Sequence, residues 1–257
     1  FKMGIYSKRR KNINENSAYY MFGLHAVKAA INNPNRKIYE LWISKNARPK
    51  IFTNYEAPSI PIFNIEKSKS LPISENKVHQ GAILKVSPLK QPKDIDEIQK
   101  NKHPKLIVIL DKVSDPQNVG AIIRSSLFFN CNAIINTLNG GSSENGSLVK
   151  AASGAFERVH YIQVTNIAQT IVKLRKLGYI IVGLDENSTE KISSFRKSNN
   201  DIAIVFGAEG KGIRRLTKEY CDMLLSIDGN HTFSSLNVST AVGITLFNIQ
   251  SNKLDGV

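Results

Sequence analysis

Three short polar segments in the C-terminal half hold the residues of this sequence that could perform chemistry. They are residues 118–124 (NVGAIIR), 206–212 (FGAEGKG) and 234–239 (SSLNVS). Each combines flexible or close-fitting backbone with polar side chains, at a point where a strand is expected to meet a helix. In open α/β sheets, ligands bind outside the carboxyl ends of the strands. Together the three segments predict a ligand site at that edge of a sheet.

The first segment follows an apolar run and opens a helix. Asn118 is expected to cap that helix, and Gly120 to permit close approach of the backbone. Arg124 lies six residues after Asn118, so its guanidinium could reach a phosphate near the helix amino end. The alternatives are that Asn118 is only a cap and that Arg124 only extends to solvent.

The second and third segments differ in chemistry. Three glycines surround Glu209, which predicts a bent loop that a ligand can approach closely. The loop is not a Walker sequence, because Gly212 follows Lys211 where Ser or Thr is needed. In the third segment, Ser235, Asn237 and Ser239 precede the last helix, where one cap is expected. No His motif supplies the base that a catalytic serine requires.

Strands and helices alternate around these segments. Strands are expected at 105–110, 133–136, 158–164, 179–184, 202–206 and 222–227. Helices are expected at 119–129, 146–153, 166–177, 214–220 and 237–250. Short apolar strands separated by helices indicate an α/β domain with a parallel sheet covered on both faces.

The chain upstream of residue 104 has a different character. Residues 1–103 hold 19 Lys and Arg against 8 Asp and Glu, a net charge of +11, whereas residues 104–257 have a net charge of only +3. Such asymmetry is typical of a nucleic-acid-binding module joined to a near-neutral domain. The alternative is a compositional bias towards Lys throughout the chain.

Four regions follow from this pass along the chain. They are a basic disordered tail at 1–17, a small α/β domain at 18–88, a linker at 89–103 and the main domain at 104–257. In the small domain a helix is expected at 24–31 and strands at 37–43 and 81–86. No apolar run is long enough to cross a membrane. Cys131 and Cys221 stand alone without metal-ligand spacing, which predicts no metal and a reducing cytoplasm.

Together, the three segments resemble the motifs of the SpoU (TrmH) family of RNA ribose 2′-O-methyltransferases, within the SPOUT superfamily. The resemblance spans 105–250 in order. Residues 22–27 (FGLHAV) and 79–81 (HQG) are similar to the L30e-like substrate-binding domain of the members that methylate a guanosine of 23S rRNA. Asp228 departs from the family, which usually has Pro there, and Lys211 occupies a variable position.

The resemblance implies a deep trefoil knot and S-adenosylmethionine as cofactor, bound by Gly207, Ile227 and Leu236. It further implies an active centre at which no metal is required. Its catalytic residues would be Arg124, Asn118, Glu209, Ser235 and Asn237. The activity expected is methyl transfer to a guanosine ribose of 23S rRNA. A tRNA-directed member and a non-catalytic RNA-binding protein are the alternatives.

A homodimer is expected, both from the family and from the last helix. That helix is apolar on nearly all sides, so it needs more cover than one sheet face provides. The face expected to meet the partner contains Val238, Ala241, Val242, Thr245 and Ile249.

Overall fold

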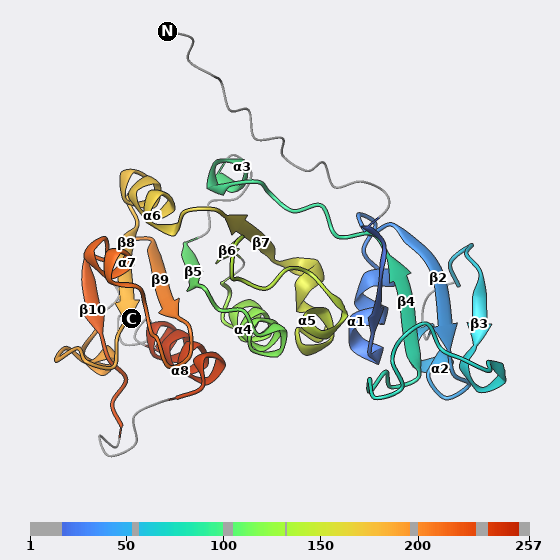
Figure 1. Cartoon of the computed structure of the whole chain (residues 1–257). Helices are drawn as coiled ribbons and strands as arrows, with labels where there is room; N and C mark the ends of the chain where they lie inside the picture. Colours follow the sequence, from blue (N-terminus) through green and yellow to red (C-terminus); the bar gives the residue numbers. More distant parts are fainter. Residues whose placement is uncertain are drawn as a thin grey trace, which may run out of the picture.

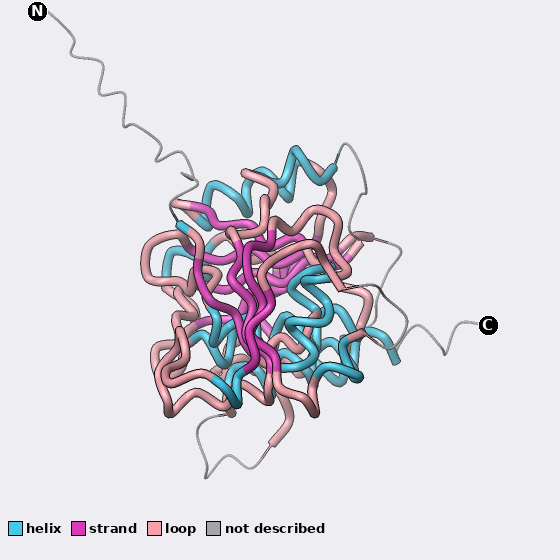
Figure 2. Tube along the Cα trace, turned by 90° about the vertical axis from the view of Figure 1, so that its right-hand side faces the viewer, coloured by secondary structure: helices cyan, strands magenta, loops and turns pink. Residues whose placement is uncertain are grey.

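Two α/β units of unequal size lie side by side in the computed structural model (Figure 1). The structure describes residues 17–52, 57–99, 105–131, 133–195, 200–229 and 236–251. The expected tail at 1–17 therefore lies outside the described residues except for Ser17. Turned by 90°, the molecule shows its strands in the middle and helices on either side (Figure 2).

The larger unit is a six-stranded sheet of order β10-β8-β9-β5-β6-β7 in which every pairing is parallel. Its strands are β5 (Leu106–Asp111), β6 (Ala133–Thr137), β7 (His160–Val164), β8 (Ile180–Leu184), β9 (Ile202–Gly207) and β10 (Met223–Leu225). Its helices are α4 (Pro116–Phe128), α5 (Gly146–Ala151), α6 (Ile167–Lys176), α7 (Arg215–Glu219) and α8 (Val238–Ser251), with 3-10 turns η3 (Ala155–Arg158) and η4 (Ile192–Ser194). The strands and helices that the sequence predicts for this part of the chain are confirmed, as is the α/β class.

Strand β5 shows why an unbroken apolar run forms a central strand. All six of its residues are buried, and alternate side chains enter different cores. Leu106, Val108 and Leu110 pack with α4, α5 and α8, whereas Ile107 and Ile109 pack with α6. A strand covered on both faces needs apolar residues at every position, so it does not alternate with polar ones.

The smaller unit is a four-stranded sheet of order β1-β4-β2-β3. It contains β1 (Tyr19–Phe22), α1 (Leu24–Ile31), β2 (Ile38–Ile43), α2 (Arg48–Ile51), β3 (Ile62–Asn64), the 3-10 turn η2 (Ile65–Lys67) and β4 (Ala82–Val86). Strand β4 is antiparallel to β1 and β2, while β2 and β3 are parallel. The predicted helix at 24–31 and the strands at 37–43 and 81–86 are confirmed, but β1, α2 and β3 were not predicted.

A buried charge network joins the two units. Arg36, from the smaller unit, donates from Nη1 to Glu144 Oε1 at 2.5 Å and from Nη2 to Glu157 Oε1 at 2.5 Å. A second bond runs from its Nε to Glu157 Oε2 at 3.2 Å, and Tyr19 donates its hydroxyl to Glu144 at 2.6 Å. Burial raises the pKa of Glu144, although the Arg36 charge opposes that change. The apolar side chains of the two units also form one continuous core.

The segment expected to be a linker at 89–103 packs against the larger unit where it is described. Leu89 is buried and donates its backbone N–H to Glu144 Oε2 at 2.9 Å. Helix α3 (Ile95–Gln99) buries Ile95 and Ile98 in the same core as α6. Both ends of the connection therefore hold the two units together, while the predicted domain boundaries stay a prediction.

Helix α8 buries a face that the sequence analysis assigned to a partner subunit. Val238, Val242, Thr245 and Ile249 are buried within this chain, where the helix packs on α4 and β9. That choice of face is therefore wrong. The helix is apolar almost all round, so periodicity could not distinguish the inward side from the outward one.

The expected knot depends on how the chain passes through 230–235, which lie outside the described residues, and it stays a prediction. None of the helices in the described residues is long and apolar enough to cross a membrane.

Candidate functional site

Three polar side chains from separate segments meet at the edge where β5 and β9 end. Asn118 Nδ2 donates to Glu209 Oε1 at 3.1 Å, and Asn237 Nδ2 donates to the same oxygen at 2.8 Å. Asn237 Nδ2 also donates to Asn118 Oδ1 at 2.9 Å. These residues are separated by 91 and 119 positions in sequence. The fold therefore brings three of the predicted catalytic residues together.

Local capping determines how Asn118 and Asn237 are presented. Helix α4 begins at Pro116, and Asp115 caps it by accepting the Asn118 backbone N–H at 2.8 Å. The expectation that Asn118 is the cap is wrong, because the helix starts two residues earlier. Asn237 does act in this way, since its Oδ1 accepts the Ser239 N–H at 2.9 Å. Its Nδ2 then remains available for Glu209.

The glycine loop after β9 is folded tightly and anchored to β5. A Cβ on Gly207 would stand 1.9 Å from the carbonyl carbon of Gly212, so only glycine fits there. Asp111, buried at the end of β5, accepts from Arg214 Nε at 2.7 Å and from the Arg214 backbone N–H at 3.2 Å. This pair fixes the far end of the loop and so keeps Glu209 close to Asn118.

Gly120 serves helix packing rather than ligand approach. A Cβ on this residue would lie 2.4 Å from the Leu148 carbonyl oxygen and 2.5 Å from the Ala151 Cβ. Both contacts belong to α5, which packs closely on α4. The expectation that Gly120 admits a ligand is therefore replaced by a close helix–helix contact.

Arg124 lies on another side of α4 from the Asn118 cluster. It is exposed and lines a cleft of about 580 Å³ between the two units, together with Gln117 and Lys150. Residues 118 and 124 are separated by about 9 Å along the axis, from the rise of 1.5 Å per residue. Arg124 and the Asn118 cluster thus share one helix, but none of the hydrogen bonds described here joins them.

The predicted cofactor residues lie around the same edge of the sheet. Gly207 ends β9, Ile227 follows β10 by two residues and is half-buried, and Leu236 precedes α8 and is half-exposed. Asp228 accepts from Ser193 Oγ at 2.5 Å. Ser235, which was predicted to be catalytic, lies outside the described residues.

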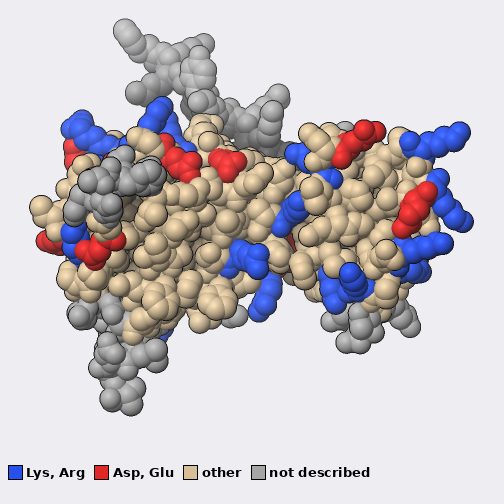
Figure 3. Space-filling model, turned by 90° about the horizontal axis from the view of Figure 1, so that it is seen from below, with Lys and Arg blue, Asp and Glu red and all other residues tan. Residues whose placement is uncertain are grey.

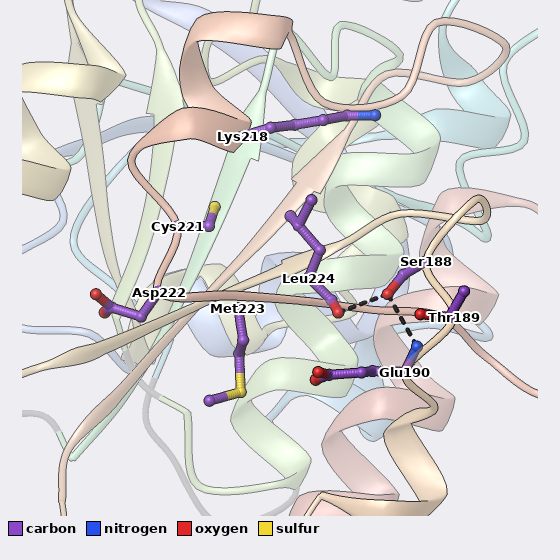
Figure 4. Close-up of a pocket in the computed structure, with 8 residues that line it drawn as sticks. All are labelled: Ser188, Thr189, Glu190, Lys218, Cys221, Asp222, Met223 and Leu224. Atoms are coloured by element: carbon purple, nitrogen blue, oxygen red, sulfur yellow. Dashed lines mark hydrogen bonds between the residues drawn. The ribbon is translucent and has the colours of Figure 1, made fainter.

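A second hollow, of about 380 Å³, opens beside β8 and β10 and contains none of the predicted site residues. Figure 4 shows Ser188 within it, donating to the Leu224 carbonyl and accepting from the Glu190 N–H, at 2.6 and 3.3 Å. Cys221 also lines it. Burial, with the charges of Asp222 and Asp111, raises the pKa of that thiol to about 12. Its sulfur is therefore protonated at neutral pH and unsuited to nucleophilic attack.

Sequence reasoning missed Asp111, Arg214 and Asp115, which hold the site in place. Asp111 is the first polar residue after a wholly apolar strand, which is a signal that the strand-end rule could have used. Asp115 stands directly before Pro116, and Pro is common at the first position of a helix. Arg214 gives no comparable signal.

Two family models match the chain. The SpoU rRNA Methylase family matches residues 105–247, and a model described as RNA 2′-O ribose methyltransferase substrate binding matches residues 20–92. The matches include the three segments that form the site and the unit that carries most of the positive charge.

Relatives match over nearly the whole chain. A protein of Ralstonia nicotianae named 23S rRNA (guanosine-2′-O-)-methyltransferase RlmB is 34% identical, over 88% of this chain and 93% of its own length. The protein of the same name in Haemophilus influenzae is also 34% identical, over 91% and 98%. The SpoU methyltransferase AviRb from Streptomyces viridochromogenes shares the fold with a TM-score of 0.76, at 18% identity, over 96% and 94%. With its three motifs assembled at one sheet edge and both of its units matched, the chain belongs to the SpoU rRNA methylase family.

Proposed function

We propose that this chain is an S-adenosylmethionine-dependent RNA 2′-O-methyltransferase that acts on a guanosine of 23S rRNA. The observation that carries the proposal is the meeting of Asn118, Glu209 and Asn237, which three distant segments contribute. Proteins that match almost the full chain at 34% identity bear the name of that activity.

The residues present fit the proposed cofactor. The glycine loop leaves no side chain at its closest turn, because Gly207 packs directly on Gly212. Leu236 and Ile227 supply partly exposed apolar surface beside it, which suits an adenine ring. Glu209 adds negative charge close by, which suits a sulfonium cation. Gly207, Ile227 and Leu236 would therefore hold S-adenosylmethionine, which when bound supplies an activated methyl group.

Alignment of the ribose is the main task that remains for the protein, because holding reactants in the correct geometry removes much of a barrier. The three hydrogen bonds between Asn118, Glu209 and Asn237 fix these side chains in advance. A guanidinium stays protonated at neutral pH. Arg124 would therefore orient the 2′-OH and the adjacent phosphate, and stabilise negative charge as the hydroxyl loses its proton.

The test is transfer of a labelled methyl group from S-adenosylmethionine to 23S rRNA, with tRNA as a second substrate. Wild-type protein should label the rRNA. Arg124→Ala should bind the cofactor normally in calorimetry yet transfer the methyl group at least about a hundredfold more slowly. Preferential labelling of tRNA would favour the tRNA-directed alternative, and binding of RNA without any transfer would favour the non-catalytic one.

We further propose that two copies of the chain pair through an apolar patch formed by Phe128, Phe247 and Ile244. Their side chains are 79%, 61% and 38% exposed. Phe129 connects the patch, because it packs edge-on against both other rings, with centroid distances of 5.1 and 6.5 Å. A two-fold axis would place the same patch on both sides of the contact. The proposed compartment is the cytoplasm, where ribosomal RNA is made in bacteria.

A further inference from the structure

The cleft between the two units has a strongly one-sided charge. The smaller unit contributes Lys77, Gln80 and His25 to its walls, and the larger unit contributes Gln117, Arg124 and Lys150. No Asp or Glu is among the described residues that line it. Figure 3 shows Lys and Arg side chains where the two lobes meet and over the smaller lobe.

The three cations of the cleft carry charge that the rest of the protein does not neutralise. Lys77 Nζ donates across the cleft to Ser147 Oγ at 3.4 Å, and Lys150 Nζ lies 5.7 Å from the centre of the Phe22 ring. Within the described part of the chain, neither lysine nor Arg124 forms an ion pair. Positive charge concentrated in a concave surface attracts an anion.

The walls of this cleft stand at a fixed separation. The Arg36 network crosses from one unit to the other, and its three side chains are almost wholly buried. Nearer to the cleft, Gly23 packs so closely on Lys150 that a Cβ would lie 3.1 Å from the lysine Cγ. Pre-formed walls lower the cost of ordering a bound ligand.

We infer that this cleft binds the single-stranded RNA backbone next to the target nucleotide, with Lys77 and Lys150 contacting phosphates. The inference rests on the proposed function. A volume of about 580 Å³ lies in the range of small-ligand pockets, so it accommodates a single strand rather than a duplex. Sequence-specific RNA recognition commonly uses such unpaired segments. Arg124 lines the same cleft, so a strand bound there lies against the proposed catalytic residue.

The experiment removes both lysine charges as Lys77→Gln with Lys150→Gln. The matched control is Lys105→Gln with Lys176→Gln, two exposed lysines at the opposite end of the sheet (Figure 1). Binding of a 23S rRNA fragment is measured by fluorescence anisotropy at several salt concentrations. The KM for RNA, kcat and cofactor affinity are measured on the same proteins.

Each lost phosphate contact on a single strand should lower the salt slope by about 0.7, so the double variant should lose about 1.4. Near 0.15 M salt this corresponds to binding about tenfold weaker, taking equal affinity near 1 M. The KM for RNA should rise similarly, whereas kcat and cofactor affinity should stay within about twofold. The control pair should retain the wild-type slope.

A second variant tests the same charge without removing either lysine. Gln117→Glu adds a carboxylate to the cleft at the first turn of α4, where an acidic residue suits the helix dipole. It should weaken RNA binding while the protein melts at the wild-type temperature.

An unchanged affinity and salt slope in the double lysine variant would overturn the inference, and so would an equal loss in the control pair. Failure of the wild-type protein to methylate RNA would instead count against the proposed function. The salt slopes would still decide the cleft.

Discussion

Arg36→Met should sharply destabilise the whole protein, because it removes the positive charge that two buried carboxylates share. The side chain of Arg36 is 0% exposed, and those of Glu144 and Glu157 are 10% and 2% exposed. Methionine fills a similar volume but offers no donor. Four hydrogen bonds are lost, three to the carboxylates and one to the Ser87 carbonyl.

Breaking a buried ion pair by removing one partner typically costs about 3–5 kcal/mol, since it leaves uncompensated charge behind. For a protein of this size, each kcal/mol shifts the melting temperature by about 2–4 °C. The expected fall is therefore on the order of 10 °C. The cost should be relieved in part by adding Glu157→Gln, because the amide carries no charge to bury.

Urea denaturation followed by circular dichroism measures the loss, with Arg215→Met as the matched control. Arg215 pairs with Glu219 on the surface of α7, where its side chain is 88% exposed, and such pairs contribute about 0.3–0.5 kcal/mol. If Arg36→Met cost no more than this control, the two carboxylates would have to be solvated, and the fixed junction between the units would be refuted.

Three further predictions concern packing, assembly and thiol chemistry. Gly120→Val should cost about 1–3 kcal/mol, because its side chain would overlap the Leu148 carbonyl oxygen; an unchanged urea midpoint would contradict this. Phe247→Glu should convert the proposed dimer to a monomer in light scattering, whereas Val242→Asp should unfold the chain, since Val242 is buried within it; a wild-type protein of 28.6 kDa in solution would refute the pairing. Cys131 and Cys221 should react with iodoacetamide at pH 8 on the order of a thousandfold more slowly than free cysteine, because burial raises the pKa of each to about 12. Rapid labelling of either would show that its thiol is accessible.

The larger unit could be predicted from sequence because its signals are local. Fully apolar runs such as Leu106–Leu110 cannot be surface strands, and helices separate them in regular order. The smaller unit was harder to predict. Strand β3 has only three residues, and its pattern Ile62–Asn64 shows little alternation. Strand β1 is stabilised by pairing with β4, more than 60 residues away, and a local pattern does not reveal such a partner.

The site was predictable in its members but not in its construction. Asn118, Glu209 and Asn237 were identified by motif, and their hydrogen bonds bring them together. The cap at Asp115 was missed because the helix start was placed at the apolar residues rather than at Pro116. The Arg36 network was also missed. Its partners are separated by 108 and 121 positions, and isolated charged residues at such distances form no pattern.

The central claim is that this chain methylates a ribose hydroxyl, and the position of the methyl group tests it most directly. A 2′-O-methyl group blocks alkaline cleavage of the adjoining phosphodiester, because the attacking hydroxyl is no longer free. Unmodified 23S rRNA should therefore be incubated with the protein and S-adenosylmethionine, hydrolysed in alkali and sequenced. We predict one newly protected linkage, on the 3′ side of a single guanosine, that is absent when Arg124→Ala replaces the wild type. Methylation found on a base, or an unchanged cleavage pattern with protein that binds the cofactor, would contradict the account.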